Sequence, residues 1–422
     1  MRKDTICVQG AYKPKNGEPR VIPIVQSTTF KYDSSKEMGD LFDLKRSGYF
    51  YSRLQNPTCD LAAAKIAMLE GGVAGMLTSS GQAANFYAVF NIASAGDHVV
   101  SSAAIYGGTF NLFNVTMRKL GINFTFVSST ASEDEIQAAI QPNTKCIFGE
   151  TISNPSLDIM DIETFAKVAH KNGIPLIIDN TFATPINCRP FEFGCDIVTH
   201  STTKYMEGHA STIGGAIVDS GKFDWEQNDK FPGLTTPDES YHGLTYTKDF
   251  GEAAYITKAT AQLMRDLGSI PAANNAWLVN LGLETLHLRM PRHCENAKKV
   301  AEYLKNNEKI TWVKCAMLED DPQHEIAMKY MPNGTCGVVS FGIKGGREAA
   351  TVFMDSLKLA AIVTHVADAR TCCLHPASTT HRQLTDKELE ECGVTPDLLR
   401  FSCGIEDADD IIEDIQQALD KI

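Results

Sequence analysis

Residues 174–206 read IPLIIDNTFATPINCRPFEFGCDIVTHSTTKYM, and two short apolar runs within them decide the fold. The first run ends at Asp179, and the second begins at Asp196 and leads into Lys204. Short runs rich in Ile, Val and Leu that are bounded by turn formers are typical of buried strands. An amphipathic helical pattern at 161–172 precedes the first run. Strands that alternate with helices in this way are typical of a parallel sheet.

The same alternation extends towards the N-terminus. Further strands are expected at 73–78, 97–101, 122–127 and 145–149. Helices are expected at 60–70, 81–94, 108–120 and 132–140. The pattern predicts an α/β fold whose mostly parallel sheet is covered by helices on both faces. Ligands bind such sheets at the carboxyl ends of the strands, which here carry Ser80, Gly81, Tyr106, Asn154 and Asp179.

The chain of 422 residues is too long for one compact core, so two packed units and an arm are expected. Residues 1–58 hold many turn formers and little regular period, which predicts an extended arm. The alternating region forms a first unit over 59–270. A smaller α+β unit over 271–422 begins with a helix at 271–306, which Pro291 should kink or restart. Its other expected elements are strands at 335–343 and 398–403 and helices at 347–357 and 407–420.

Residues 221–251 interrupt the alternation with a polar and aromatic stretch that Gly and Pro punctuate. A stretch of this length without a period is often functional in a compact domain. It is also what a plain surface insertion looks like, and the sequence leaves both interpretations open.

The composition excludes several classes of protein. A formal net charge of −13 argues against binding to nucleic acid or to an anionic membrane. No apolar run approaches the length of a membrane-spanning helix, and no secretory signal follows Met1. The 12 cysteines are scattered without a C-x-x-C pair, and no His or Cys cluster has metal-ligand spacing. We therefore expect reduced thiols, no metal site and a cytoplasmic location.

The segment DIVTHSTTKYM at 196–206 carries the strongest chemical signal, because it places Lys204 just after a buried strand. A lysine amine is normally protonated, but burial or a cationic neighbour turns it into the kind of amine that forms a Schiff base with pyridoxal 5'-phosphate (PLP). A single lysine is usually only a solvated surface charge. Here Asp179 ends the neighbouring strand, and PLP needs an anion beside its pyridine nitrogen. Alone, Asp179 is as easily a structural acid at a strand end.

Three further groups could bind the same cofactor. Ser80, Gly81 and Gln82 open a helix whose backbone N–H groups form a phosphate seat, which the hydroxyls of Ser201 and Thr203 could complete. Tyr106 follows a strand, and its aromatic ring could stack on a pyridine ring. A single tyrosine at such a position is, however, more often a half-buried residue that packs over the sheet. In the arm, Tyr51 and Arg53 are two residues apart, so on an extended chain their side chains point the same way and could bind one phosphate together. The alternative is that both side chains are solvated.

Taken together, these segments resemble the PLP-dependent enzymes of cysteine and methionine metabolism, the transsulfuration group. The resemblance extends from QSTTF at 26–30 to RFSCGIED at 400–407. It implies the fold-type I, aminotransferase-like architecture of a PLP-dependent transferase. It also implies a homotetramer of catalytic dimers, in which the arm of one subunit reaches its neighbour.

The resemblance also implies roles for individual residues. Lys204 holds PLP, Asp179 pairs with the ring nitrogen and Tyr106 stacks on the ring. Asn154 lies near the PLP hydroxyl, and Arg400 binds the substrate carboxylate. The phosphate is bound by Ser80, Gly81, Gln82, Ser201 and Thr203, together with Tyr51 and Arg53 from the neighbouring subunit. Tyr51 would also border the substrate.

Within this group the chain is most similar to the O-acetylhomoserine sulfhydrylase branch, through YGGTFNLF at 106–113 and the stretch at 221–251. This similarity implies γ-replacement, in which sulfide or methanethiol displaces acetate from O-acetyl-L-homoserine and gives homocysteine or methionine. Methionine γ-lyases usually carry a cysteine where Gly108 stands. His365 occupies a position where relatives usually carry serine or asparagine, so it is either a substrate-pocket residue or an ordinary buried histidine.

Several alternatives stay open at this point. Methionine γ-lyase, or γ-elimination of the cystathionine γ-lyase and synthase type, would use the same residues. An NAD-dependent dehydrogenase would need G-x-G-x-x-G after its first strand, and the sequence GGVAG at 71–75 does not match that motif. A non-catalytic binding protein with this fold would be colourless, whereas a PLP enzyme should be yellow.

Overall fold

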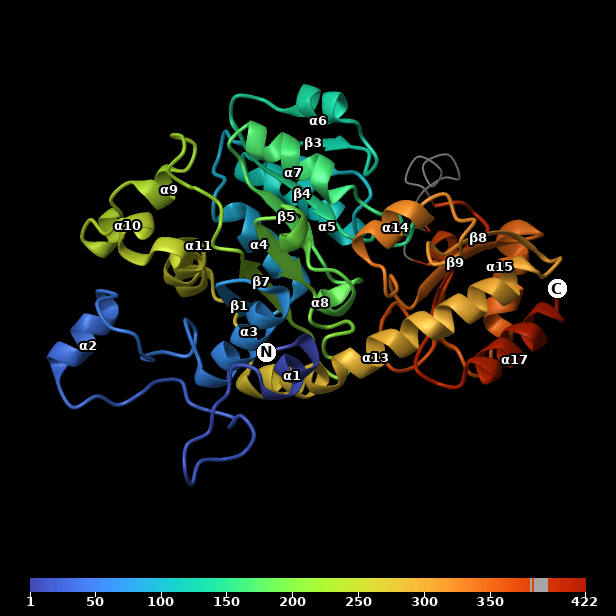
Figure 1. Cartoon of the computed structure of the whole chain (residues 1–422), viewed down its shortest axis with the longest axis horizontal. Coiled ribbons are helices and arrows are strands. Elements are labelled where there is room, and N and C mark those ends of the chain that lie inside the picture. The colour runs from blue at the N-terminus through green and yellow to red at the C-terminus, as the bar shows by residue number, and fades with distance from the viewer. Residues whose placement is uncertain (380–381, 383–393) are drawn as a thin grey trace.

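The computed structural model describes residues 1–379, 382 and 394–422. Two sheets dominate the structure, and the long helix α13 (Ala273–Lys305) runs from beneath the first towards the second (Figure 1). The first sheet has seven strands in the order β1-β7-β6-β5-β4-β2-β3. Its strands are β1 (Ala74–Thr78), β2 (His98–Ser102), β3 (Asn123–Val127), β4 (Thr144–Glu150), β5 (Leu176–Asp179), β6 (Ile197–His200) and β7 (Gly215–Asp219).

The large sheet is parallel except at β7, which pairs antiparallel with both β1 and β6. Successive residues of β2, β5, β6 and β7 are all buried, and successive side chains of a strand point to opposite faces. Both faces are therefore covered, as the continuous apolar runs in the sequence predict. The first half of the chain supplies helices α3 (Pro57–Glu70), α4 (Gly81–Phe90), α5 (Gly107–Asn111), α6 (Glu133–Ala139), α7 (Ile162–Lys171) and α8 (Thr184–Asn187).

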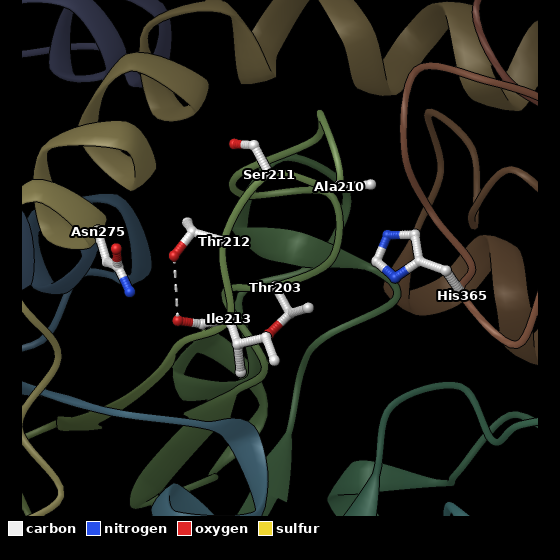
Figure 2. Close-up of a pocket in the computed structure, with 7 residues that line it drawn as sticks. All are labelled: Thr203, Ala210, Ser211, Thr212, Ile213, Asn275 and His365. Carbon is white, nitrogen blue, oxygen red and sulfur yellow. Dashed lines mark hydrogen bonds between the residues drawn. The ribbon is translucent and has the colours of Figure 1, made fainter.

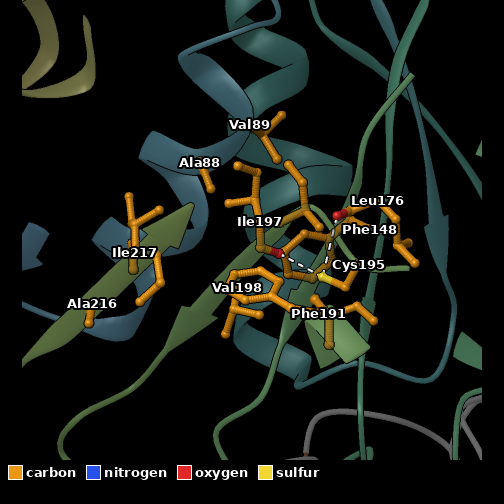
Figure 3. Packing of buried hydrophobic residues seen from close by; sticks show 14 of the residues in the cluster. Ala88, Val89, Phe148, Leu176, Phe191, Cys195, Ile197, Val198, Ala216 and Ile217 are labelled. Carbon is orange, nitrogen blue, oxygen red and sulfur yellow. Dashed lines mark hydrogen bonds between the residues drawn. The ribbon is translucent and has the colours of Figure 1, made fainter. Parts of the chain in front are cut away.

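Tight packing fixes the strands that carry the site. Figure 3 shows Phe148 of β4, Ile197 of β6 and Val89 of α4 in one cluster, and all three side chains are fully buried. The thiol of Cys195 donates to the carbonyl oxygens of Leu176 and Ile197, at 3.5 and 3.1 Å. This contact ties the start of β6 to β5, so the ends of the two strands cannot shift independently.

The second sheet has five strands in the order β10-β11-β12-β9-β8. It confirms the α+β pattern expected for the end of the chain, although the boundaries at 58/59 and 270/271 stay predictions. Its elements are β8 (Ile310–Lys314), α14 (His324–Tyr330), β9 (Val338–Ile343), α15 (Gly346–Ser356), β10 (Ala361–Ile362), β11 (Cys372–Leu374), β12 (Leu398–Ser402) and α17 (Ala408–Leu419).

One expectation about local structure was wrong, and of the kink or restart expected at Pro291 the restart is excluded. Residues 1–58 are not wholly extended, because they contain α1 (Lys3–Gln9) and α2 (Ser35–Phe42), and α3 already begins at Pro57. Asn56 caps that helix by accepting from the backbone N–H of Thr58, and proline is favoured in the first helical turn. Helix α13 does not restart at Pro291. Buried residues on both sides of the proline, including Met290 and Cys294, anchor both halves of this continuous helix in the core.

The stretch at 221–251 is a structured outgrowth with its own aromatic cluster. It contains α9 (Pro232–Thr235) and α10 (Tyr246–Phe250) and leads into α11 (Ala254–Lys258), on the far side of the molecule from the second sheet (Figure 1). Two short helices follow at 259–264 and in α12 (Arg265–Leu267). Trp225 stacks on Tyr255 with ring centroids 5.4 Å apart, and both side chains are buried. The aromatic residues of this stretch thus pack as core.

Candidate active site

A cavity of about 200 Å³ opens at the carboxyl ends of the parallel strands. The residues that line it come from the turns after β1, β2, β4, β5 and β6, and from the second sheet. Ten of the residues singled out in the sequence lie around it together with further neighbours. The lining comprises Ser80, Gly81, Gln82, Asn85, Tyr106, Thr109, Glu150, Ile152, Asn154, Asp179, Thr181, Phe182, Ser201, Thr203, Lys204, Ile213, Thr364, Val366 and Arg400.

Lys204 lies in the turn after β6, where its backbone N–H donates to the carbonyl oxygen of Ser201 at 3.2 Å. Burial lowers the pKa of its amine from 10.5 to about 8, and the positive charge of Arg400 adds to this effect. An amine with this pKa exists partly as the free base near neutral pH. It is therefore a nucleophile in a way that a solvated lysine is not.

Asp179 ends β5 and is held by donors on both carboxylate oxygens. The backbone N–H of Thr181 donates to Oδ1 at 3.0 Å, and the Thr181 hydroxyl donates to the same oxygen. The amide of Asn85 donates to Oδ2 at 3.1 Å. The Asn85 side chain in turn accepts from the hydroxyl of Thr199 at 2.6 Å. This network fixes the direction of the acid group towards the cavity.

The start of α4 has the features expected of an anion seat. Ser80 caps the helix by accepting from the N–H of Ala83 at 3.1 Å. In the described part of the chain, no hydrogen bond uses the backbone N–H of Gly81 or Gln82. These two groups face the cavity at the positive end of a helix of 10 residues, where an anionic ligand is stabilised.

Gly81 is required there because the turn that carries Lys204 passes against it. A Cβ atom at position 81 would lie 2.7 Å from Cβ and 2.9 Å from Cα of Ser201. We expect Gly81→Ala to push this turn away, to lower the free energy of unfolding by about 1–3 kcal/mol, and to weaken cofactor binding about tenfold or more. Titration of the apoprotein with PLP and denaturant unfolding measure the two effects.

The control for this prediction is Gly39→Ala in α2, where an added Cβ meets no atom within 4 Å. That variant should retain wild-type cofactor affinity. Equal cofactor affinity in Gly81→Ala and Gly39→Ala would contradict the close approach of the start of α4, at Gly81, to the turn that carries Ser201 and Lys204.

The hydroxyls that follow β6 are held differently from each other. The Thr203 hydroxyl donates to the carbonyl oxygen of Gly214 at 3.1 Å and accepts from the N–H of Gly214 at 3.0 Å. Thr203 thus fastens the Lys204 turn to the start of β7. The Ser201 side chain lines the cavity beside Gly81, with no hydrogen bond of its own to another described residue.

Tyr106 stands at the mouth of the cavity, and its residue is 49% exposed. Its backbone N–H donates to Oε1 of Glu150 at 2.7 Å. Its ring lies against Gly108, where a Cβ atom would be 2.5 Å from Cε1 of the ring. Burial, followed by the charge of Asp179, holds the pKa of Glu150 well above its ordinary value. Glu150, at the edge of the sheet that borders the cavity, therefore favours its protonated, neutral form.

Arg400 enters the cavity from β12 of the second sheet. It donates to Oδ1 of Asn154 at 3.1 Å and to the carbonyl oxygens of Thr364 and His365, at 3.2 and 3.1 Å. Its Nε is buried and has no partner among the described residues. Asn154 thus lies in the cavity as expected, where it orients the arginine.

Three of the expected site residues do not line this cavity. His365 lines an adjoining outer hollow of about 340 Å³. Tyr51 is 43% exposed in the arm, and the guanidinium of Arg53 lies 5.3 Å from the centroid of its ring. Arg53 also donates to the carbonyl oxygen of Arg265. The arm therefore does not bring this pair to the cavity of its own chain.

Sequence reasoning missed Asn85, Thr181 and Glu150. Asn85 could have been found because it follows Gly81 by four residues and therefore shares its helix face. Thr181 follows Asp179 by two residues, which is the spacing of a local side-chain to backbone turn. Glu150 follows the strand expected at 145–149, and only the sheet order places it beside Asp179.

The described residues contain neither a candidate metal site nor a membrane-spanning helix. No group of three or more His, Cys, Asp or Glu side chains is placed to hold a metal ion. No helix in that part of the chain has the length and apolar character needed to cross a lipid bilayer.

A parallel sheet that presents a buried lysine, a fixed aspartate and a free helix N-terminus at one edge defines the class of PLP-dependent enzymes of the aminotransferase-like fold. Residues 4–420 match the profile of a family described as Cys/Met metabolism PLP-dependent enzyme. The chain belongs to this family, and its cofactor is PLP.

Characterised relatives are similar over almost the whole chain. The homocysteine synthase of Schizosaccharomyces pombe is 46% identical, and the match covers 95% of this chain and 94% of that protein. The O-acetyl-L-homoserine sulfhydrylase of Corynebacterium glutamicum is 47% identical, with coverages of 94% and 92%. A crystal structure from Campylobacter jejuni, assigned as an O-acetylhomoserine (thiol)-lyase, is 37% identical with a TM-score of 0.96 over 100% of both chains. That structure contains N'-pyridoxyl-lysine-5'-monophosphate.

Proposed function

We propose that this enzyme replaces the acetyl group of O-acetyl-L-homoserine with sulfide and releases homocysteine, and that methanethiol serves as a second sulfur donor that gives methionine. The observation that carries the proposal is the convergence of Lys204, Asp179 and Arg400 on one cavity. The names of relatives that are 43–47% identical supply the substrate.

The residues around the cavity fit PLP as a ligand. Lys204 would hold its aldehyde carbon, and the free N–H groups of Gly81 and Gln82 would bind its phosphate with help from Ser80, Ser201 and Thr203. Asp179 would hold a proton on the pyridine nitrogen, and Tyr106 would cover the ring. When bound, PLP supplies the electron sink that acidifies the hydrogens of the substrate carbon chain.

The remaining steps fall to side chains of this chain. The guanidinium of Arg400 would bind the substrate carboxylate in the bidentate geometry that arginine favours, and Asn154 would keep it oriented. The amine of Lys204, once free, would take the proton from Cα and return it at the end of the cycle. Tyr106, at the cavity mouth, would border the path of the incoming sulfide. Acetate leaves as the sulfur adds, so the substrate amine and carboxylate are retained in the product.

Gly108 favours replacement over methionine γ-elimination as the main reaction. The ring of Tyr106 occupies the space that a larger residue at 108 would need, since a Cβ atom there would lie 2.5 Å from the ring. A γ-lyase with cysteine at this position would therefore hold its tyrosine differently. The cystathionine-type eliminations remain the second candidate, because they use the same lysine, aspartate and arginine.

A product assay decides between these reactions. The purified enzyme with O-acetyl-L-homoserine and sulfide should form homocysteine, whereas with methionine alone it should form 2-oxobutanoate at least about 100 times more slowly, a difference of roughly 2.7 kcal/mol in barrier. Both products are quantified by mass spectrometry. Comparable rates of 2-oxobutanoate formation with and without sulfide would identify a lyase instead.

We also propose that the enzyme is a cytoplasmic homotetramer of catalytic dimers, in which Tyr51 and Arg53 serve the cavity of a neighbouring copy. Support comes from their position outside their own cavity and from the arm, which extends away from the body of the chain (Figure 1). The described cysteines are all free and buried, as is usual for proteins of reducing compartments.

A further inference from the structure

His365 lies in the wall between the inner cavity and the outer hollow. Its neighbours Thr364 and Val366 line the inner cavity with Lys204, whereas His365 itself lines the outer hollow. Figure 2 shows its imidazole ring facing the turn that carries Thr203 and Ala210. Thr203 and Ile213 line both spaces, so the two adjoin each other.

The two ring nitrogens of His365 face different charged groups. Nδ1 lies 3.5 Å from Nζ of Lys204, and no other described side chain makes a hydrogen bond with that amine. Nε2 lies 3.5 Å from Oδ2 of Asp368 and has no hydrogen-bond partner among the described residues. Asp368 is only 5% exposed, and its other oxygen accepts from the N–H of Arg370 at 2.6 Å. The amine, the ring and the carboxylate thus form one row.

We propose that His365, supported by Asp368, exchanges protons with Lys204 and relays them between this amine and the Asp368 carboxylate. The inference rests on the proposed function, because it concerns the proton that Lys204 carries during that reaction. His365 is a positioning residue in this scheme, since it acts through Lys204 and does not contact the substrate.

The exchange is balanced in charge and protons. A proton leaves Nζ of the Lys204 ammonium and adds to Nδ1 of His365, so one positive charge moves from the lysine to the imidazole. The carboxylate of Asp368 lies 3.5 Å from Nε2, so it stabilises the imidazolium and can take up the Nε2 proton. No electron transfer and no further reactant are involved.

The surroundings of His365 favour its neutral imidazole, which is the form that can accept a proton from Lys204. Burial lowers the pKa of His365 below its ordinary value, and Lys204 and Arg400 lower it further, while Asp368 and Glu207 oppose them. His365 is therefore the weaker base of the pair, because the pKa of Lys204 is about 8. The imidazole accepts the proton only transiently, as a relay must.

The first test measures the amine directly, without turnover. Full-length protein freed of cofactor is labelled with trace acetic anhydride across a pH series, and acetylation of Lys204 is quantified by peptide mass spectrometry. His365→Leu removes the hydrogen-bond acceptor of the ammonium, so the pKa of Lys204 should fall. A fall of about one unit raises the free amine at pH 7 from about one tenth to about one half, or roughly fivefold. Unchanged labelling of Lys204 would overturn the proposal.

Lys258 is an internal reference for this measurement. Its amine is also buried with a pKa of about 8, and it donates to the carbonyl oxygen of Asn91 at 2.7 Å, away from the cavity. Its labelling should be the same in both proteins. A parallel change at Lys258 would mean that the variant had loosened the whole fold, and this result too would overturn the assignment.

The second test separates proton exchange from hydrogen bonding. His365→Asn keeps an acceptor beside Lys204 but cannot carry a proton. In D₂O, the holoenzyme should exchange the Cα hydrogen of L-norvaline, which has no leaving group, about tenfold or more slowly in this variant, within the range of acid–base effects. His209→Asn is the matched control, since His209 is half exposed and pairs with Glu207 at 3.7 Å rather than with Lys204.

Wild-type exchange in His365→Asn would refute the relay. The labelling result does not depend on any substrate, so it stands even if the enzyme fails to make homocysteine. Failure of the proposed function and failure of the relay can therefore be distinguished.

Discussion

Lys204→Met is expected to be colourless and to lose about 10⁴-fold or more of its turnover with O-acetyl-L-homoserine and sulfide, because two roles disappear with one amine. The amine would hold the cofactor, and it would move the Cα proton. Methionine retains the aliphatic stem, so packing in the turn after β6 should be nearly preserved. The visible absorbance of the purified protein and its kcat measure the two roles separately.

Lys258→Met is the matched control for this prediction. The pKa of the Lys258 amine is also lowered to about 8, as for Lys204, but Lys258 lies away from the cavity. This variant should remain yellow and retain kcat within about threefold, although the loss of its hydrogen bond to Asn91 should cost about 1–3 kcal/mol of stability. A yellow and active Lys204→Met would rule out Lys204 as the cofactor lysine.

Asp179→Asn should lower kcat/KM by about 10³-fold, which is the usual scale for losing a fixed electrostatic partner. Three hydrogen bonds orient the carboxylate, from the N–H and hydroxyl of Thr181 and from the amide of Asn85. An asparagine places an NH₂ group against one of these donors and removes the negative charge that would hold a proton on the pyridine nitrogen. Steady-state kinetics measure the loss, and cofactor titration shows whether binding also weakens.

The neighbouring acid provides a contrast with Asp179. The raised pKa of Glu150 favours its uncharged form, so Glu150→Gln removes little charge, and its amide oxygen can still accept from the N–H of Tyr106. We expect kcat/KM of Glu150→Gln to fall by less than about tenfold, or 1.4 kcal/mol. If the two variants were equally impaired, the assignment of the charged role to Asp179 alone would be wrong.

Much of the fold could be predicted from local pattern. The six parallel strands of the large sheet were found because each is a short apolar run next to a helical pattern, and β2, β5 and β6 are buried on both faces. Strand β7 was missed because GAIVD at 215–219 follows a Gly-rich turn and no helix, so the alternation that exposed the others was absent. Strand β8 (ITWVK) was missed because Thr311 interrupts its apolar residues and it is not set in an alternation of strands with helices.

The candidate site was predictable where one residue type at one position has a distinctive chemistry. Lys204, Asp179 and Gly81 each stand at an element boundary that the sequence reveals. Glu150 has no such local signal, and its place in the cavity depends on the order of the strands in the sheet. His365 was ambiguous for the same reason, because nothing in the residues around it shows that its ring reaches Lys204.

The sequence by itself determined the alternation of strands and helices, the turn that presents a lysine and the aspartate that ends the preceding strand. These features are local, since periodicity and turn chemistry act within about ten residues. Only the tertiary structure decided which charges share the cavity: Arg400, 196 positions beyond Lys204, depresses the pKa of that lysine. Electrostatic interaction depends on distance in space and on burial, and both are set only when the second sheet packs against the first.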